Sequence, residues 1–91
     1  MVSGRKKVYE DALIRFGSHN QLVVAIEELS ELQKEICKFF RHEGTVENLI
    51  EEVADVSIMI EQIKFILDIE DDVNKVMGEK IERLKRRIER L

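Results

Sequence analysis

Residues 18–67 read SHNQLVVAIEELSELQKEICKFFRHEGTVENLIEEVADVSIMIEQIKFIL. Two long segments with helical apolar periodicity are separated here by a short polar run that ends in Gly44 and Thr45. Glycine is a common helix stop and threonine a good N-cap, while Ser18 and Gln21 have the spacing of a capping box. The stretch therefore predicts two antiparallel helices, over about 18–42 and 45–67.

Two further helices are expected on either side of this pair. Residues 5–16 place Val8, Ala12 and Phe16 on one helical face, and Gly17 follows as a stop. Asp68 is expected to cap a fourth helix over about 68–91, interrupted by Gly78. Its heptad-like seam consists of Val73, Met77, Leu84, Ile88 and Leu91, with Ile81 between them. The chain is thus predicted to be one all-α, four-helix bundle-like domain over residues 1–91, with residues 1–4 frayed.

The composition agrees with this fold class. Proline is absent, only four of the 91 residues are glycine, and 37% are charged, which favours helices over a turn-rich β-sandwich. A single cysteine excludes an internal disulfide framework and a cysteine-based zinc site. No apolar run approaches about 18 residues and no signal-peptide core is visible, so we expect a cytoplasmic protein without a membrane partner.

Charge is distributed unevenly along the chain. Residues 19–72 carry four basic and fourteen acidic side chains, a net charge of −10, whereas residues 73–91 carry seven basic and three acidic ones, a net charge of +4. An acidic centre repels a phosphate backbone. We therefore expect no nucleic-acid partner.

The acidic side chains of the two central helices lie beside or within their apolar stripes. At about 100° per residue, Glu28 and Glu31 border the apolar arc of their helix, while Glu52 falls inside the arc of the next helix and Asp55 close to it. An ionised carboxylate in such a place is costly unless it is paired or bound to a cation. The two stripes comprise Leu22, Ile26, Leu29, Ile36 and Phe40, then Leu49, Val53, Val56, Ile60, Ile63 and Leu67. Cys37, Phe39 and Phe40 are expected to pack in the core.

No basic residue four positions further along compensates the repulsion between neighbouring acids in these helices. Glu27 and Glu31, Glu31 and Glu35, and Glu51 and Asp55 are like-charge pairs four residues apart, each destabilising by a few tenths of a kcal/mol. A divalent cation would convert this repulsion into coordination, and an all-oxygen donor set favours Mg²⁺, Mn²⁺ or Ca²⁺. The alternative interpretation is a solvated charged surface. A di-iron bundle is excluded because its Glu-x-x-His motifs are missing.

The acidic motif also has a family resemblance. Glu27-Glu28-x-x-Glu31, followed after twenty residues by Glu52-x-x-Asp55, resembles the motif of the MazG-like, all-α nucleoside triphosphate pyrophosphohydrolases. This resemblance implies an Mg²⁺-dependent enzyme, with Mn²⁺ as a possible substitute, that converts a (d)NTP and water to a (d)NMP and pyrophosphate. It implies Glu28, Glu31, Glu52 and Asp55 as metal ligands, Glu28 and Glu31 as the catalytic carboxylates that take a proton from water, and Glu27 as an additional acidic position.

Two other functions stay open from the sequence. A non-catalytic helical interaction or regulatory module could use the same acids to bind metal or a basic partner. The related phosphoribosyl-ATP pyrophosphohydrolases share the carboxylates but tend to carry a Lys-x-Gly-Glu-Glu lead-in, where this chain has Val24-Ala25-Ile26-Glu27-Glu28. Residues proposed to contact a nucleotide are Lys34, Lys38, Lys80, Arg83 and Arg87 for the phosphates, and His19 and Asn20 for the base or ribose.

A second apolar set on the helix over 45–67 predicts self-association. Ile50, Ala54, Ile58 and Phe65 lie on a side of that helix away from its main stripe. Leaving large apolar side chains in water would forgo roughly 1.5–3 kcal/mol for each. We therefore expect the working unit to be a dimer or a tetramer.

Overall fold

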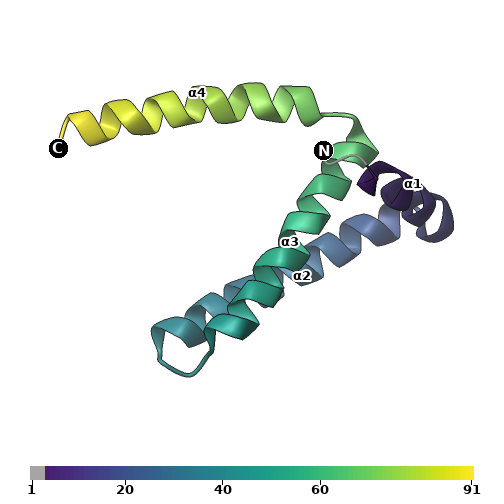
Figure 1. Ribbon diagram of the computed structural model, residues 1–91, viewed down its shortest axis with the longest axis horizontal. Coiled ribbons are helices and arrows are strands. Elements are labelled where there is room, and N and C mark those ends of the chain that lie inside the picture. The colour runs from purple at the N-terminus through teal and green to yellow at the C-terminus, as the bar shows by residue number, and fades with distance from the viewer. Residues whose placement is uncertain (1–3) are drawn as a thin grey trace.

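The computed structural model describes residues 4–91, and this part of the chain contains four α-helices and no strand (Figure 1). They are α1 (Arg5–Phe16), α2 (Ser18–Phe40), α3 (Val46–Leu67) and α4 (Glu70–Glu89). The all-α prediction is confirmed. The sequence predicts that residues 1–4 are frayed. Residues 1–3 lie outside the described range, and Gly4 immediately precedes α1. None of these helices combines the length and the apolar character that crossing a bilayer requires.

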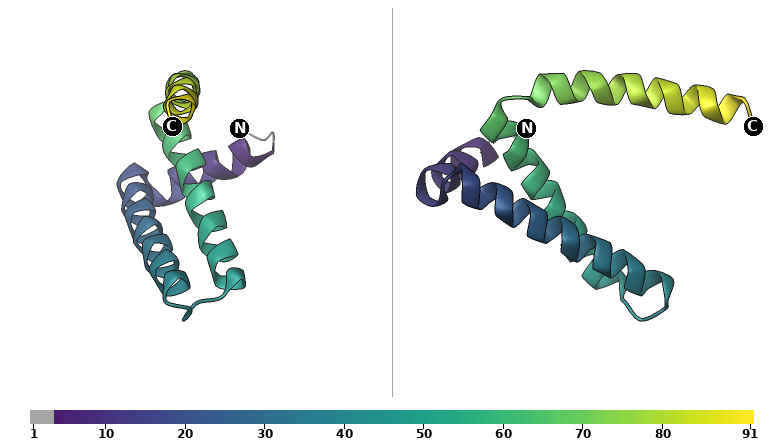
Figure 2. Two further views of the ribbon diagram at one scale, coloured as in Figure 1. Left: turned by 90° about the vertical axis from the view of Figure 1, so that its left-hand side faces the viewer. Right: turned by 180° about the vertical axis from the view of Figure 1, so that it is seen from behind.

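The helices form a hairpin with a separate arm. α2 and α3 run antiparallel and pack along their length, and α1 packs against both near the start of α2 (Figures 1 and 2). Among the described elements α4 contacts α3 alone, and it projects away from the hairpin. The molecule is accordingly extended, measuring 48 × 36 × 22 Å, so α4 does not complete a four-helix bundle within one copy.

The turn between α2 and α3 forms largely as the sequence predicts. The Thr45 Oγ1 accepts a hydrogen bond from the Asn48 backbone N–H at 3.1 Å, which confirms the N-cap of α3. The Lys38 carbonyl accepts from the backbone N–H groups of Glu43 at 2.9 Å and Gly44 at 3.3 Å. A Cβ at Gly44 would lie 3.2 Å from the Lys38 Cβ, so this close return of the chain favours glycine.

Two capping predictions are wrong. Gly17, at a φ of 84°, occupies the N-cap of α2, and no side chain among residues 4–91 caps that end, so Ser18 and Gln21 do not form a capping box. Asp68 adopts the left-handed region at a φ of 54° and ends α3 instead of starting α4, whose N-cap is Ile69. Glycine and aspartate both tolerate positive φ more readily than most residues, so each takes the sharp turn at its helix junction.

The predicted stripes match the observed helix contacts only in part: Val56 is buried as expected, and Leu22, Leu49 and Ile63 are half-buried. Within residues 4–91 the buried apolar side chains are Tyr9, Ala25, Val56 and Met59. Many members of the predicted stripes and of the expected core are exposed, among them Ile26, Leu29, Ile36, Phe40, Val53, Ile60 and Leu67, together with Cys37 and Phe39. α2 and α3 are therefore rotated about their axes relative to the prediction. This is possible because each helix carries apolar residues on more than one side.

α1 is attached to α3 through a polar contact. Tyr9 is 5% exposed, and its hydroxyl donates a hydrogen bond to Glu61, whose other oxygen receives Arg5 Nη1 at 2.9 Å. Burial, followed by the hydrogen bond to Glu61, raises the pKa of Tyr9 to about 12. Val8 and Phe16, expected on the packed face of this helix, are exposed, so Tyr9 anchors α1 in their place.

Replacing the N-cap of α3 tests the turn that closes the hairpin. Thr45→Ala removes the oxygen that accepts from Asn48 and should lower the free energy of unfolding by about 1 kcal/mol. Thr45→Ser keeps that oxygen and should stay within about 0.5 kcal/mol of wild type. Urea unfolding followed by circular dichroism at one fixed protein concentration measures both, and equal losses in the two variants would contradict the capping role.

Candidate metal centre

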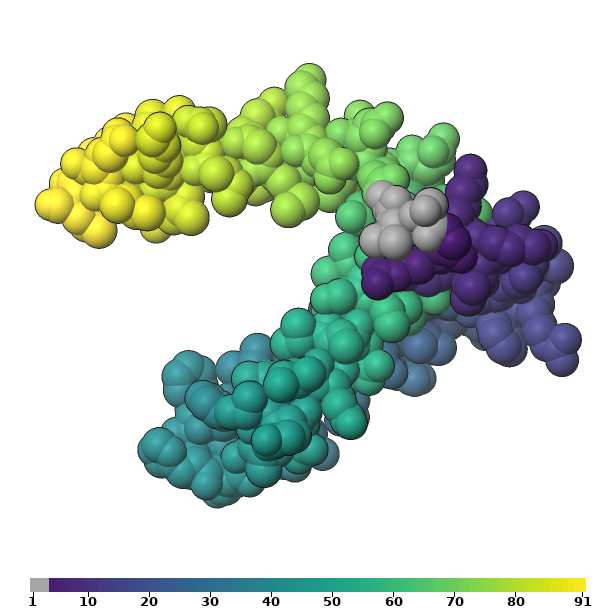
Figure 3. All heavy atoms as spheres, viewed as in Figure 1, coloured from purple at the N-terminus to yellow at the C-terminus, as the bar shows by residue number. Residues whose placement is uncertain are grey.

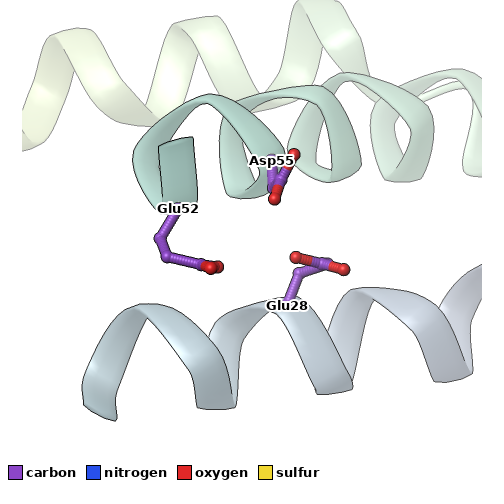
Figure 4. A group of neighbouring side chains, drawn as sticks. All are labelled: Glu28, Glu52 and Asp55. Atoms are coloured by element: carbon purple, nitrogen blue, oxygen red, sulfur yellow. The ribbon is translucent and has the colours of Figure 1, made fainter. Parts of the chain in front are cut away.

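Three carboxylates from α2 and α3 face one another across the hairpin. Glu28 comes from α2, and Glu52 and Asp55 come from successive turns of α3 (Figure 4). One oxygen of each can be chosen so that all three lie within 4.8 Å of one another. Glu28 and Glu52 are half-buried and Asp55 is exposed, so the group opens to solvent on one side. Each belongs to the acidic motif, and antiparallel packing of the two helices brings both halves of that motif together.

Both half-buried carboxyl groups are electrostatically disfavoured as anions. Burial raises the pKa of the Glu28 carboxyl above its ordinary value, and the Asp55 charge adds to the rise. Burial likewise raises the pKa of Glu52, followed by the charges of Asp55 and Glu28. Every charge that contributes to these two shifts belongs to a carboxylate of the described chain. Ionisation of Glu28 and Glu52 therefore lowers the stability of the folded chain, and their protonation raises it.

A hard divalent cation fits this donor set. The Glu52 Oε2 is buried and has no hydrogen-bond partner within residues 4–91, so its desolvation is uncompensated by the protein. Oxygens on opposite sides of one Mg²⁺ are about 4.2 Å apart and those around Ca²⁺ about 5 Å. In this group the three chosen carboxylate oxygens lie within 4.8 Å of one another, and this upper bound falls between the two values. Small side-chain rotations would thus bring the three oxygens onto one ion.

The remaining acids of the motif lie around this group. Glu31 and Glu27 are exposed on α2, and their charges also raise the pKa of Glu28. Glu35 was not singled out from the sequence as a site residue, yet it is half-buried and its charge raises the pKa of Glu52. The Glu35 Oε1 lies 3.6 Å from Lys38 Nζ, while its Oε2 is buried without a partner in the described chain. Its place on the buried face of α2, one helical heptad after Glu28, is the signal that could have identified it.

The basic residues proposed for phosphate are divided between two regions. Lys34 is exposed on α2, and Lys38 lies on the same helix beside Glu35. Lys80 and Arg83 line a shallow surface pocket of about 270 Å³ whose walls all belong to α4. Arg87 is exposed on the same arm. Because α4 does not contact α2, one copy of the chain does not gather these side chains around the three carboxylates.

A second pocket lies along the hairpin from the acidic group. It measures about 390 Å³ and is lined by Ala12, Phe16, Asn20, Gln21, Val24, Met59 and Gln62. Gln21 is buried, and the Gln62 Oε1 is buried without a hydrogen-bond partner among the described residues. Asn20 donates its side-chain amide to the Phe16 carbonyl at 2.9 Å, whereas His19 is exposed and does not line the pocket. Of the polar residues that line this pocket, the sequence singles out Asn20 as a candidate but neither glutamine, because polar residues of a packed helical face leave no periodic signal.

Comparison of the chain with protein-family models, curated proteins and solved structures found no match. The interpretation of the acidic group therefore rests on the residues and geometry of this chain.

Removing one charge from the acidic group should stabilise the metal-free protein. Glu52 has a raised pKa, so the stability that its protonated form contributes is present at acidic pH and lost as the pH rises through that pKa. Glu52→Gln should therefore raise the Tm in EDTA at pH 7, with the difference from wild type shrinking towards pH 4. Mn²⁺ or Mg²⁺ should raise the wild-type Tm and have a smaller effect on the variant.

The neighbouring Glu51→Gln is the matched control for this experiment. Glu51 is exposed and lies outside the group of three carboxylates. Its substitution should leave the metal-dependent rise in Tm unchanged. Equal responses of the two variants in differential scanning fluorimetry would show that the Glu52 carboxylate has no special environment.

Proposed function

We propose that the protein is an Mg²⁺-dependent nucleotide pyrophosphohydrolase, which converts a (d)NTP and water to a (d)NMP and pyrophosphate. The observation that carries the proposal is the meeting of Glu28, Glu52 and Asp55 between α2 and α3, with the Glu52 Oε2 buried and unpartnered in the described chain. The resemblance of the acidic motif to MazG-like pyrophosphohydrolases supports the same reaction.

The proposed roles follow from the position and charge of each carboxylate. Glu28, Glu31, Glu52 and Asp55 would hold the metal, with Glu27 as an additional acid near them. Bound Mg²⁺, or Mn²⁺ in its place, would neutralise phosphate charge and lower the pKa of water. Glu28 or Glu31 would accept the proton of the attacking water. The raised pKa of Glu28 suits a general base, since a base is most effective when its pKa lies closer to the working pH.

The pocket lined by Phe16 and three side-chain amides is the proposed site for the base and ribose. Gln21 precedes Glu28 by seven residues, about 10 Å along α2 and on nearly the same face. Amides present both donors and acceptors, which suits the polar edge of a nucleobase. Asn20 contributes to this pocket, and His19 would act from its rim. For the phosphates, Lys34 and Lys38 are proposed from α2 and Lys80 and Arg83 from α4.

The proposed working unit is a dimer or a tetramer. Ile50 and Ile58 of the second apolar set on α3 are 61% and 42% exposed in one copy, and Ala54 is also exposed. A second copy would remove these side chains from water.

A specific observation also favours a second candidate, a non-catalytic helical interaction module. Over residues 4–91, twenty-two large hydrophobic side chains are exposed, which is the surface expected of a protein that works by binding others. The two candidates differ in turnover, so one assay separates them.

Turnover across the common (d)NTPs is the direct test of the enzymatic proposal. With Mg²⁺ and added inorganic pyrophosphatase, a malachite-green assay should detect phosphate from at least one nucleotide. Glu52→Gln should reduce kcat at least about 100-fold, because it removes a charged ligand of the proposed ion. Glu51→Gln should stay within about twofold of wild type. Folded wild-type protein without turnover on any nucleotide would leave the interaction module as the function.

Substitution in the amide pocket tests where the base binds. Gln62→Leu removes the unpartnered carbonyl and should raise KM for the best substrate by up to about tenfold, the value of one hydrogen bond, with little change in kcat. Gln33→Leu alters an exposed glutamine on α2 and should leave both constants unchanged. An unchanged KM in Gln62→Leu would place the base elsewhere.

A further inference from the structure

The polar side of the hairpin continues beyond the three carboxylates, towards the turn between α2 and α3. Glu28 and Asp55 face each other across the two antiparallel helices (Figure 4). Seven residues along a helix return to nearly the same side, about 10 Å further on. Seven residues after Glu28 is Glu35, and seven residues before Asp55 is Asn48. Antiparallel packing therefore places Glu35 and Asn48 at facing positions, one heptad closer to the turn.

Glu52 lies between these two pairs of oxygen-bearing side chains. It follows Asn48 by four residues and precedes Asp55 by three, so it lies on the same side of α3 as both. Burial is the main cause of the raised pKa of Glu52, and the charge of Glu35 contributes to the rise. Glu52 is therefore close enough to interact with the acids on both sides of it.

Buried oxygens without a hydrogen-bond partner are concentrated at this place. Among the described residues three buried side-chain oxygens lack a hydrogen bond, and two of them are the Oε2 atoms of Glu35 and Glu52. The Glu35 side chain is about nine-tenths buried, with 11% of it exposed. A carboxylate oxygen in such a place costs free energy unless something binds it. A positively charged ligand between the two side chains would offset that cost.

Lys38 compensates only part of the charge of Glu35. Its Nζ lies 3.6 Å from the Glu35 Oε1, which is beyond hydrogen-bond length, and the Oε2 stays without a hydrogen bond. The Lys38 side chain is 36% exposed, so it lies at the edge of the contact between the helices. The oxygens that remain suit a hard cation, because Mg²⁺, Mn²⁺ and Ca²⁺ bind carboxylate and amide carbonyl oxygens.

This end of the hairpin is accessible to an ion from solution. Asn48 is exposed. α1 packs near the other end of the hairpin, at the start of α2, and among the described elements α4 contacts α3 alone. The space-filling view shows the turn end of the hairpin standing clear of α4 (Figure 3). Water or phosphate oxygens could therefore complete the coordination of an ion bound here.

We propose that the hairpin holds a second divalent cation, bound by Glu52, Glu35 and the side-chain carbonyl of Asn48. It lies next to the ion proposed for Glu28, Glu52 and Asp55, and Glu52 bridges the two ions through its two oxygens. Paired metal ions in proteins are typically about 3.5–4 Å apart. The second site is built from the side chains of the hairpin, so it stands whether or not the protein hydrolyses nucleotides.

Within the proposed function, the second ion gives the substrate a direction along the hairpin. The amide pocket, the three carboxylates and the second site follow one another along α2, with Gln21, Glu28 and Glu35 spaced by one heptad each. A nucleotide with its base in the amide pocket would extend its phosphates past the first ion towards the second. The second ion would then neutralise the departing pyrophosphate, with Lys38 beside it. This role rests on the proposed function, whereas the site itself does not.

Manganese binding to the purified chain tests the site without any nucleotide. Electron paramagnetic resonance counts bound ions, because the six-line signal of free Mn²⁺ weakens on binding. Wild type should bind two Mn²⁺ per chain and, when fully loaded, give the spectrum of a spin-coupled pair. Glu35→Gln should weaken the second binding step at least about tenfold and abolish the coupling. Asn48→Ala should weaken the same step, whereas the exposed neighbour Glu47, as Glu47→Gln, should keep both ions and their coupling.

The outcomes separate the second site from the proposed metal centre. One Mn²⁺ per chain in wild type, lost in Glu52→Gln, would overturn the second site and leave the proposed function standing. A second Mn²⁺ that persists in both Glu35→Gln and Asn48→Ala would lie elsewhere and would also overturn the proposal. No bound Mn²⁺ in wild type would overturn both sites. Two coupled ions in a protein without turnover on any nucleotide would support the second site and contradict the proposed function alone.

Discussion

Repulsion among Glu28, Glu52 and Asp55 acts directly against the packing of α2 on α3, which is the main contact of the fold. Each of these acids lies where the two helices approach, and the charges around them have the same sign. The helices nevertheless pack along their length, and Ala25, Val56 and Met59 are buried. A protein that keeps an unfavourable charge cluster in its main interface has stability to gain from any cation that binds there.

The rotation of the two helices connects this charge cluster with the exposed surface. Turning Glu28 and Glu52 towards each other turns Ile26, Leu29, Val53 and Ile60 away from the contact and towards solvent. A chain of this length already buries a modest share of its surface, so leaving these side chains open makes a single copy weakly stabilised. The acidic group and the exposed apolar surface are thus two results of the same rotation.

The distribution of charge along the chain has a spatial counterpart. The acidic residues are concentrated on the hairpin, and the basic residues of the C-terminal segment are on an arm that does not contact α2. Opposite charges kept apart within one copy can attract between copies, where they also determine which surfaces pair.

The sequence by itself determined the number of helices and most of their limits, because stops such as Gly17 and Gly44 and the cap at Thr45 act through nearby backbone atoms. The sequence also identified Glu28, Glu52 and Asp55, the acids that meet, because antiparallel helices joined by a short turn place the two halves of the motif opposite each other. Only the tertiary structure decided which sides of α2 and α3 face each other, and with them the partial burial of Glu35, the amide pocket and the projection of α4. The physical reason is that both central helices are apolar on more than one side, so periodicity permits several rotations, and the choice among them depends on contacts between residues far apart in the sequence.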